Sequence, residues 1–352
     1  MLLVPTVGVV VANHDNSAFV TRAIDSVARQ TFRDIRVVVV DDASNDESDR
    51  IIREHLSRLV DPRFHYVRLP SNAGQAGSMR CGLGELDTAF VCFLDSDDIW
   101  YEDFIARHLE VHLNADFPVA LTYCDSLIID ADDRLLAGTA WWFDSDPTLP
   151  PRRSIDRSLL PTLDPASGEI SYHASRAVTL YSQWSPDGAT NTTASMMFRR
   201  SFIDLVLVPP NAELRLYVDF YLATFACLLT GAIAIHDALY GYRMHGLNKH
   251  SNAAVLGGAY NSSTRPWRPI RTGMLQLIQS VMLSEAESIR RGFGHQRYEE
   301  ALELVSSELD KLLGAPDTKN PATRLLSKAV DLLATGLGNG RRKAARSRSI
   351  TS

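Results

Sequence analysis

The chain has 352 residues, a net charge of -6, 45% apolar residues and 22% charged residues, which is an ordinary composition for a globular protein. This length allows one large α/β domain with additions, or two domains. The acidic balance argues against nucleic acid as the main partner. Four cysteines without metal-ligand spacing indicate a reducing, cytoplasmic compartment. The longest uncharged run, Phe220 to Ile235, is shorter than the roughly 20 residues that span a bilayer.

Strands and helices alternate through the first third of the chain. Apolar runs predict strands at Val7 to Ala12, Arg36 to Val40, His65 to Leu69 and Phe90 to Leu94. Helical patterns predict helices at Phe19 to Ala28, Ser44 to about Leu59, Gln75 to Leu86 and Trp100 to Asn114. The second helix has a capping-box spelling, Ser44-x-x-Glu47. Such alternation indicates βαβ units and a parallel sheet.

Polar side chains follow all four of these strands. They are Asp15, Asp41, Asp42, Asn72, Asp95 and Asp97. Ligands of open parallel sheets bind beyond the carboxyl ends of the strands, so we expect these residues along one edge. A plainer alternative is that polar residues follow any buried strand. This alternative explains why these positions are polar, but it explains less well why most of them are carboxylates.

The most informative stretch is Phe90-Val-Cys-Phe-Leu-Asp95-Ser-Asp97-Asp98, in which a buried strand ends in three carboxylates. In an extended segment Asp95 and Asp97 project to the same side while Ser96 points away. Paired carboxylates suit Mg²⁺ or Mn²⁺, ions that usually accompany phosphate. The alternative is a solvated turn in which Asp98 caps a helix beginning near Trp100.

The pattern changes after residue 117. Short strands are predicted at Val119 to Cys124, Ser126 to Ile129, Thr193 to Arg199, Ile233 to Ile235 and Leu239 to Tyr242, with a helix at Ala212 to Leu229. Residues 132–190 are rich in Pro, Ser, Asp and Gly, which is typical of a functional loop or lid. Its aromatics, among them Trp141, Trp142 and Trp184, either stack on a sugar ring or pin the loop.

After Pro269 the pattern is helical, ending in helices at Tyr298 to Leu313 and Ala322 to Leu337 and a basic tail at residues 341–348. Two interpretations of the last helix stay open. With the basic tail it either lies on an anionic cytoplasmic membrane face, or packs on the catalytic domain or in a homodimer.

Five segments resemble the family 2 glycosyltransferases in order and spacing. They are Val7-Gly-Val-Val-Val-Ala-Asn-His-Asp15, Ser26-Val-Ala-Arg-Gln-Thr-Phe-Arg-Asp34, Val39-Val-Asp-Asp-Ala-Ser44, Asn72-Ala-Gly74 and Leu94-Asp-Ser-Asp-Asp98. The resemblance covers about residues 4 to 250 and implies the GT-A fold. Residues 1–116 would form a Rossmann-like nucleotide-sugar-binding half with a mostly parallel sheet, and 117–262 an acceptor-binding half. Residues 263–338 would add a helical extension and 339–352 a disordered tail.

The resemblance also implies inverting transfer of a sugar from a nucleotide-diphospho-sugar, with UDP as the default nucleotide, to a hydroxyl of a glycan or lipid-linked acceptor. It implies nucleotide contacts from Ala12, Asn13, Asp15, Asp41, Asp42, Asn72 and Asp95. It implies a Mn²⁺ or Mg²⁺ ion held by Asp97, Asp95 and His245, donor or diphosphate contacts from Arg80 and Arg243, and Asp219 as general base.

Physical chemistry agrees with these roles. Departure of a nucleoside diphosphate builds negative charge that a divalent ion and an arginine stabilise, and the attacking hydroxyl needs one carboxylate base. Each role has a plainer alternative. Asp219 could be a helix N-terminal charge, His245 a packed or surface histidine, and Arg243 a partner in a structural ion pair.

The sequence departs from the family pattern at four places. Ala12-Asn13-His14 replaces Pro-Thr-Tyr, Ala43 stands where Gly is common, Met79 where a basic residue often meets the donor, and Val218 where Glu often precedes the base. Two other functions stay open. A nucleotidyl- or phosphotransferase would not need Asp219, and a sugar-nucleotide-binding scaffold would bind donor without turnover.

Overall fold

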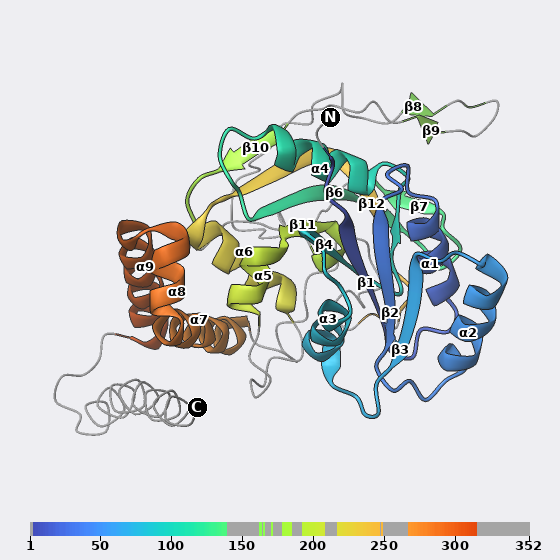
Figure 1. Cartoon of the computed structure of the whole chain (residues 1–352), viewed down its shortest axis with the longest axis horizontal. Coiled ribbons are helices and arrows are strands. Elements are labelled where there is room, and N and C mark those ends of the chain that lie inside the picture. The colour runs from blue at the N-terminus through green and yellow to red at the C-terminus, as the bar shows by residue number, and fades with distance from the viewer. Residues whose placement is uncertain are drawn as a thin grey trace, which may run out of the picture. The chain divides into compact units, whose positions relative to one another are not determined.

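The computed structural model describes residues 3–138, 162–163, 165, 170–171, 178–184, 192–207, 217–246, 248 and 267–314 (Figure 1). The chain divides into two compact units, Met1–Arg265 and Pro266–Ser352. The predicted helix at 322–337, the basic tail, and most of the 132–190 loop with Trp141 and Trp142 lie outside the described residues.

The predicted alternation of strands and helices is confirmed in the first unit. Its elements are β1 (Val7–Asn13), α1 (Val20–Ala28), β2 (Ile35–Asp41), α2 (Ser48–Leu59), β3 (Phe64–Arg68), α3 (Gly74–Gly84) and β4 (Phe90–Asp95). Strand β1 pairs in parallel with β2 and β4, and β2 pairs in parallel with β3. The half of the sheet formed by β1 to β4 is therefore parallel throughout, as crossover helices require.

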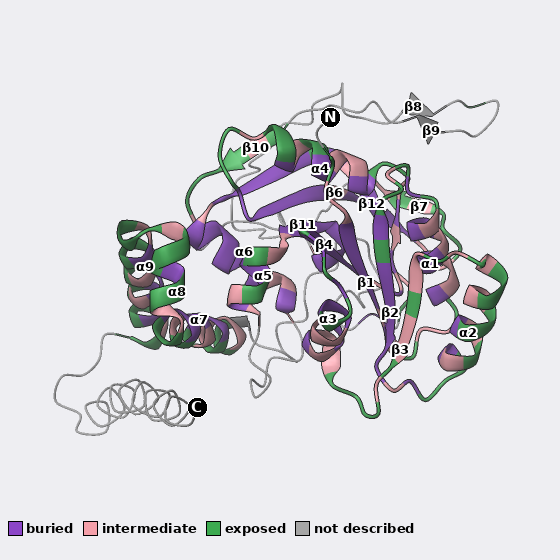
Figure 2. Cartoon of the chain, in the orientation of Figure 1, coloured by how far each residue is buried: buried purple, intermediate pink, exposed green. Residues whose placement is uncertain are grey.

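This half is built around strands that are buried on both faces (Figure 2). Val7, Val9 and Val11 share one hydrophobic core with the apolar stripe of α1, and Val10 points to the opposite face. There α3 comes close, because a Cβ on Gly82 would lie 2.5 Å from Val10 Cγ1. Glycine at position 82 lets this helix approach the sheet.

The sheet continues into residues 99–243. Its further elements are β5 (Ile99–Trp100), α4 (Phe104–Asn114), β6 (Leu121–Ile129), β7 (Leu135–Ala137), β10 (Val178–Tyr181), η3 (Thr193–Ser195), β11 (Met196–Arg199), α5 (Arg200–Val206), α6 (Val218–Leu229) and β12 (Ala232–Arg243). The strand order of this sheet is β10-β12-β6-β11-β4-β1-β2-β3. Strand β11 is antiparallel to both β4 and β6, so it joins the two halves of one mostly parallel sheet. A small separate pair is formed by β8 (Thr162–Leu163) and β9 (Ile170–Ser171).

Two predicted helix starts are wrong. Helix α2 begins at Ser48 rather than Ser44, because the Ser44 hydroxyl donates to the Asp41 carboxylate instead of capping a helix. Helix α4 begins at Phe104 rather than near Trp100, because Trp100 pairs with Tyr240 in the sheet. The first start is displaced by a contact within the loop after β2, and the second by pairing with a strand far along the chain.

The strands predicted within residues 119–242 were too short. The two runs around Asp125 form the single strand β6, and the two runs at the end of this unit form the single strand β12. Strand β12 passes through register shifts against β6 between Ile235 and Tyr240. Such irregularities let one strand continue through polar residues that the sequence pattern reads as a break.

The second unit contains α7 (Trp267–Ser284), α8 (Ala286–Phe293) and α9 (His295–Leu313), which agrees with the helical pattern predicted there. Apolar residues at helical spacing are buried, among them Met274, Ile278 and Met282 of α7. A buried ion pair links Arg271 Nη2 to Glu308 Oε1 at 2.7 Å. Among the helices that the structure describes, none is long and apolar enough to cross a membrane.

Candidate active site

The carboxyl ends of the parallel strands meet at one edge, as predicted. Asn13 at the end of β1 is in register with Asp41 at the end of β2, and Ala12 is in register with Asp95 at the end of β4. The polar residues that follow these strands consequently lie along one side of the sheet. They fall into two groups, one around Asp41 and Asp42 and the other around Asp95, Asp97 and Asp219.

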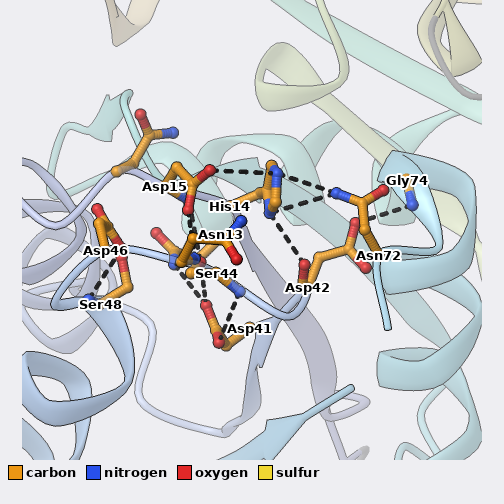
Figure 3. Close-up of polar contacts among 12 residues, drawn as sticks. Asn13, His14, Asp15, Asp41, Asp42, Ser44, Asp46, Ser48, Asn72 and Gly74 are labelled. Atoms are coloured by element: carbon orange, nitrogen blue, oxygen red, sulfur yellow. Dashed lines mark hydrogen bonds and ion pairs between the residues drawn. The ribbon is translucent and has the colours of Figure 1, made fainter. Parts of the chain in front are cut away.

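Asp41 is fully buried and makes its contacts inside the protein (Figure 3). Its carboxylate accepts hydrogen bonds from Asn13 Nδ2 at 2.8 Å and from the Ser44 hydroxyl, and Arg68 Nε lies 3.4 Å away. Asn13 is itself only 1% exposed. For both residues these contacts favour a role in supporting the loop after β2 over the direct nucleotide contact that we predicted.

Asp42 holds the start of α3. Its two carboxylate oxygens accept the backbone N–H groups of Ala73 at 2.6 Å and Gly74 at 2.8 Å. Its carbonyl oxygen accepts from His14 Nδ1–H at 2.9 Å, which fixes the tautomer, so His14 Nε2 accepts from Asn72 Nδ2 at 2.9 Å. Figure 3 shows His14 between Asp42 and Asn72.

His14 belongs to this group although it was not among the predicted binding residues. The only sequence signal was its position within the segment that departs from the family pattern. At another departure, Ala43, the backbone has a φ of 53°, in the region that favours glycine, which explains why glycine is common at this position. Asp15, also at positive φ, is exposed and accepts the N–H of Asn45 at 2.6 Å.

Asp95 lies at the centre of the second group. Its carboxylate accepts from Gln75 Nε2 at 3.0 Å and from Thr193 Oγ1 at 3.3 Å. Burial, followed by the negative charges of Asp97 and Asp219, raises the pKa of Asp95 to about 7. Sequence reasoning missed Gln75 and Thr193, because a glutamine in the first turn of α3 and a threonine in the short helix η3 carry no signal of their own.

Asp219 sits in the first turn of α6, one residue after the start of the helix. Its Oδ1 accepts the N–H of Phe220 at 2.8 Å. A helix N-terminus favours the ionised form, yet burial prevails and raises the pKa of Asp219 to about 6. The charge of Asp219 is a smaller cause of the raised pKa of Asp95, after burial and the charge of Asp97.

Asp97 and His245 face each other, with Asp97 Oδ2 3.3 Å from His245 Nε2. The His245 side chain is only 4% exposed, and its ring centroid lies 4.7 Å from that of Phe19. Its Nδ1 atom has no hydrogen-bond partner within the part of the chain that the structure describes. His245 is thus a packed histidine with one nitrogen directed at a carboxylate.

The predicted metal set of Asp95, Asp97 and His245 is not assembled. Across the described ranges, no three His, Cys, Asp or Glu side chains converge to hold one ion. Asp95 bonds instead to Gln75 and Thr193, whereas Asp97 pairs with His245. The remaining pair still fits a Mn²⁺ or Mg²⁺ ion of the type that takes one or two protein ligands and completes its shell with phosphate and water oxygens.

The two predicted donor-contact arginines differ. Arg243 is fully buried and bonds to Asp97, Asp130 and Asp133, which favours the structural alternative. Arg80 on α3 is partly buried, and burial lowers its pKa. Met79 is fully buried in the core, so it offers the donor no contact surface.

Asp98 does not cap a helix. It is 3% exposed, and its Oδ1 accepts the backbone N–H of Arg243 at 2.9 Å. Burial and the charge of Asp97 raise the pKa of Asp98 well above its ordinary value.

Residues 8–153 match the model of the family described as "Glycosyl transferase family 2". An uncharacterized glycosyltransferase of Nostoc sp. is 27% identical over 251 residues, 70% of this chain and 67% of that protein. The succinoglycan biosynthesis protein ExoO of Rhizobium meliloti is 32% identical over 127 residues, only 36% of this chain and 35% of that protein.

Among solved structures, the S. aureus TarS fragment 1–349 in complex with UDP-GlcNAc has a TM-score of 0.50 and 15% identity, covering 87% of this chain and 83% of that one. This likeness concerns the fold and supports the GT-A architecture. Residues 8–153 therefore form a domain that matches glycosyl transferase family 2, the relatives are named glycosyltransferases, and the fold agrees with the GT-A architecture.

Proposed function

We propose that the protein transfers a sugar from a nucleotide-diphospho-sugar to a hydroxyl of a glycan or lipid-linked acceptor, with inversion at the anomeric carbon. The observation that carries this proposal is the group of carboxylates at the end of β4, where Asp97 Oδ2 lies 3.3 Å from His245 Nε2 and the charge of Asp219 helps to raise the pKa of Asp95. We infer that a candidate base on α6 lies close to the donor edge. UDP is the default nucleotide, and the UDP-GlcNAc complex of TarS is consistent with it.

Asp219 is proposed as the general base. A pKa of about 6 suits this task, because the carboxylate is ionised at neutral pH and still basic enough to accept the acceptor hydroxyl proton in the transition state. Inversion follows from this arrangement, since one base on the face opposite the leaving group supports a single displacement. The proton then resides on Asp219 until solvent removes it.

Asp97 and His245 are proposed to hold the Mn²⁺ or Mg²⁺ ion. Such an ion would supply positive charge at the diphosphate as the glycosidic bond to it breaks. The protein's own contribution is to keep the Asp97 carboxylate and His245 Nε2 on one side of the site, 3.3 Å apart. Asp95, fixed by Gln75 and Thr193, is proposed to lie nearer the ribose or a metal-bound water.

The nucleobase of the donor is proposed to lie against the loop that Asp42, His14 and Asn72 hold together. Ala12, Asp15 and Arg80 remain proposed donor contacts.

Since the named relatives include a succinoglycan biosynthesis protein and a teichuronic acid biosynthesis glycosyltransferase, we place the acceptor among polysaccharide precursors. We also propose a cytoplasmic location, where sugar nucleotides are made.

The experiment is a screen of UDP-, GDP- and dTDP-sugars with Mn²⁺, which measures nucleotide release with and without glycan and lipid-linked acceptors. The account expects release from one nucleotide class, stimulated by acceptor, and a product of inverted anomeric configuration by proton NMR. Retained configuration would contradict the single-base mechanism. Release that is unchanged in Asp219→Asn would contradict the role of this carboxylate.

A further inference from the structure

Arg243, the last residue of β12, is a cation with a side chain that is 0% exposed. Its guanidinium nitrogens lie against protein oxygens, and among the described residues Nη2 makes an ion pair rather than a hydrogen bond. Nε donates to the carbonyl oxygen of Asp97 at 2.7 Å, Nη1 donates to that of Asp130 at 2.9 Å, and Nη2 pairs with the Asp133 carboxylate. A buried charge is tolerated only with such partners.

The contact between the two segments runs in both directions. Arg243 donates its backbone N–H to Asp98 Oδ1 at 2.9 Å, while its side chain holds the carbonyl of the preceding residue, Asp97. The ring of Phe19 lies 5.1 Å from the Arg243 guanidinium carbon and 4.7 Å from the His245 ring. We call this set of contacts, made by Phe19, Asp97, Asp98 and Arg243, the clasp.

We propose that Arg243 is a positioning residue that holds Asp97 and His245 in register with each other. The inference rests on the proposed function, because it concerns the two residues proposed as metal ligands. Arg243 fixes the backbone of Asp97 through its side chain, and it fixes His245 through the chain two residues later. The 3.3 Å spacing of Asp97 Oδ2 and His245 Nε2 is therefore set by the clasp.

This role differs from the diphosphate contact that the family resemblance implies. Nε, Nη1 and Nη2 all face protein oxygens, and the side chain has no exposed surface. A diphosphate could reach the guanidinium only if the turn of residues 95–98 or the turn of residues 130–133 moved away. Arg243 therefore acts through Asp97 rather than on the substrate.

Arg22 of α1 provides a matched control. Its Nη1 donates to the carbonyl oxygen of Ala131 at 2.7 Å and to Asp133 Oδ2 at 3.2 Å. It thus anchors the same turn of residues 130–133 through the same kind of group, but its bonds go to that turn and not to Asp97. The Arg22 side chain is 40% exposed and that of Arg243 is 0% exposed, so the place of the effect, at residues 95–98, separates the two roles better than its size.

The test compares Arg243→Lys with Arg22→Lys. Hydrogen exchange of the free protein should rise at residues 95–98 in Arg243→Lys and only at residues 130–134 in Arg22→Lys. Calorimetric titration of Mn²⁺ with UDP should show affinity weakened about 10- to 100-fold in Arg243→Lys, the range for residues that orient metal ligands, and changed less than about twofold in Arg22→Lys. Equal effects of the two variants, or wild-type affinity in Arg243→Lys, would overturn the proposal.

A second pair of variants tests the other half of the clasp. Asp98→Asn keeps an oxygen that can accept the Arg243 N–H, and Asp98→Ala removes it. The proposal expects Asp98→Ala to lose Mn²⁺-dependent UDP affinity and Asp98→Asn to retain most of it. If neither variant loses affinity, the result contradicts the clasp. If the wild type binds no nucleotide, the proposed function fails, and the exchange comparison alone decides the positioning role.

Discussion

The two groups of carboxylates at the sheet edge are held in opposite ways. Asp41 and Asp42 each accept at least two short hydrogen bonds from protein donors, so their charges are compensated within the fold. Asp95 accepts longer hydrogen bonds, of 3.0 and 3.3 Å, and burial with the nearby charge of Asp97 raises its pKa to about 7, while burial raises the pKa of Asp219 to about 6. Similar sequence positions after strands and at helix starts thus hide different electrostatic environments.

The difference teaches which residues support the site and which are prepared to react. A carboxylate saturated by backbone donors stabilises a loop but has little capacity left for a ligand. A carboxylate with a raised pKa costs folding free energy when ionised, and proteins keep such groups mainly at functional sites. The following variants break or sharpen this comparison.

Removal of the proposed base should have the largest effect. Asp219→Asn should lower kcat/KM about 10²- to 10⁴-fold, because a general base contributes about that much. Thermal stability at pH 8 should be unchanged or higher, since a buried charge is removed. Asp103→Asn, at the exposed N-cap of α4, is the control for a helix-terminal charge, and its kcat/KM should stay at the wild-type value. An equal loss in both variants would contradict the account.

Acidification should remove activity by protonating the same group. Since Asp219 accepts a proton only when ionised and burial raises its pKa to about 6, kcat/KM at saturating Mn²⁺ should level off above about pH 7. Below pH 6 it should fall about tenfold per pH unit. The measurement is a pH profile of initial rates at limiting donor and acceptor. A profile that stays flat to pH 4.5 would exclude this carboxylate as the base.

The unfolding free energy of the protein should change in opposite directions when a charge is removed from one group or from the other. Asp41→Asn leaves buried donors without an ionised acceptor and should cost about 1–3 kcal/mol of unfolding free energy. Asp95→Asn should raise stability at pH 8. That gain should shrink as pH falls below about 7, because the folded protein then binds a proton at Asp95, and it should vanish only near pH 4, where the carboxyl of the unfolded chain is protonated as well.

Urea unfolding at pH 8 and pH 5 measures both effects. A loss of stability of the same size in Asp41→Asn and Asp95→Asn at pH 8 would show that the two environments do not differ.

The smallest effect concerns the loop beside Asp42. Ala43→Gly should raise the unfolding free energy by roughly 0.5–1 kcal/mol, because Ala43 has a φ of 53° where glycine is not strained. Ala23→Gly, in the buried face of α1, should lower it by at least as much. Urea midpoints provide the comparison, and a destabilised Ala43→Gly protein would show that the loop does not need glycine-like backbone.

The fold was largely predictable because periodicity reports burial directly. The valine-rich strands β1 and β2 follow from continuous apolar runs and the amphipathic helix α1 from helical apolar spacing, and their order implies the parallel half of the sheet. Trp100 shows the limit, because its pairing with Tyr240 depends on a strand far along the chain. Local patterns carry no information about such partners.

The site was predictable as a set of positions and less so as a set of roles. Motif spacing predicted that Asp42, Asp95 and Asp97 lie at one edge of the sheet. It did not reveal that Gln75 and Thr193 hold Asp95. It also did not reveal that Arg243 is buried, because these facts depend on tertiary packing.

The most direct test of the central claim is a calorimetric titration of UDP, GDP and dTDP with and without Mn²⁺, on the wild type and on Asp97→Ala. The account predicts that one of these nucleotides, UDP by default, binds the wild type only with Mn²⁺, and that Asp97→Ala abolishes this binding while leaving the folded state intact by circular dichroism. Metal-independent binding that survives Asp97→Ala, or no binding of any of the three nucleotides, would contradict it.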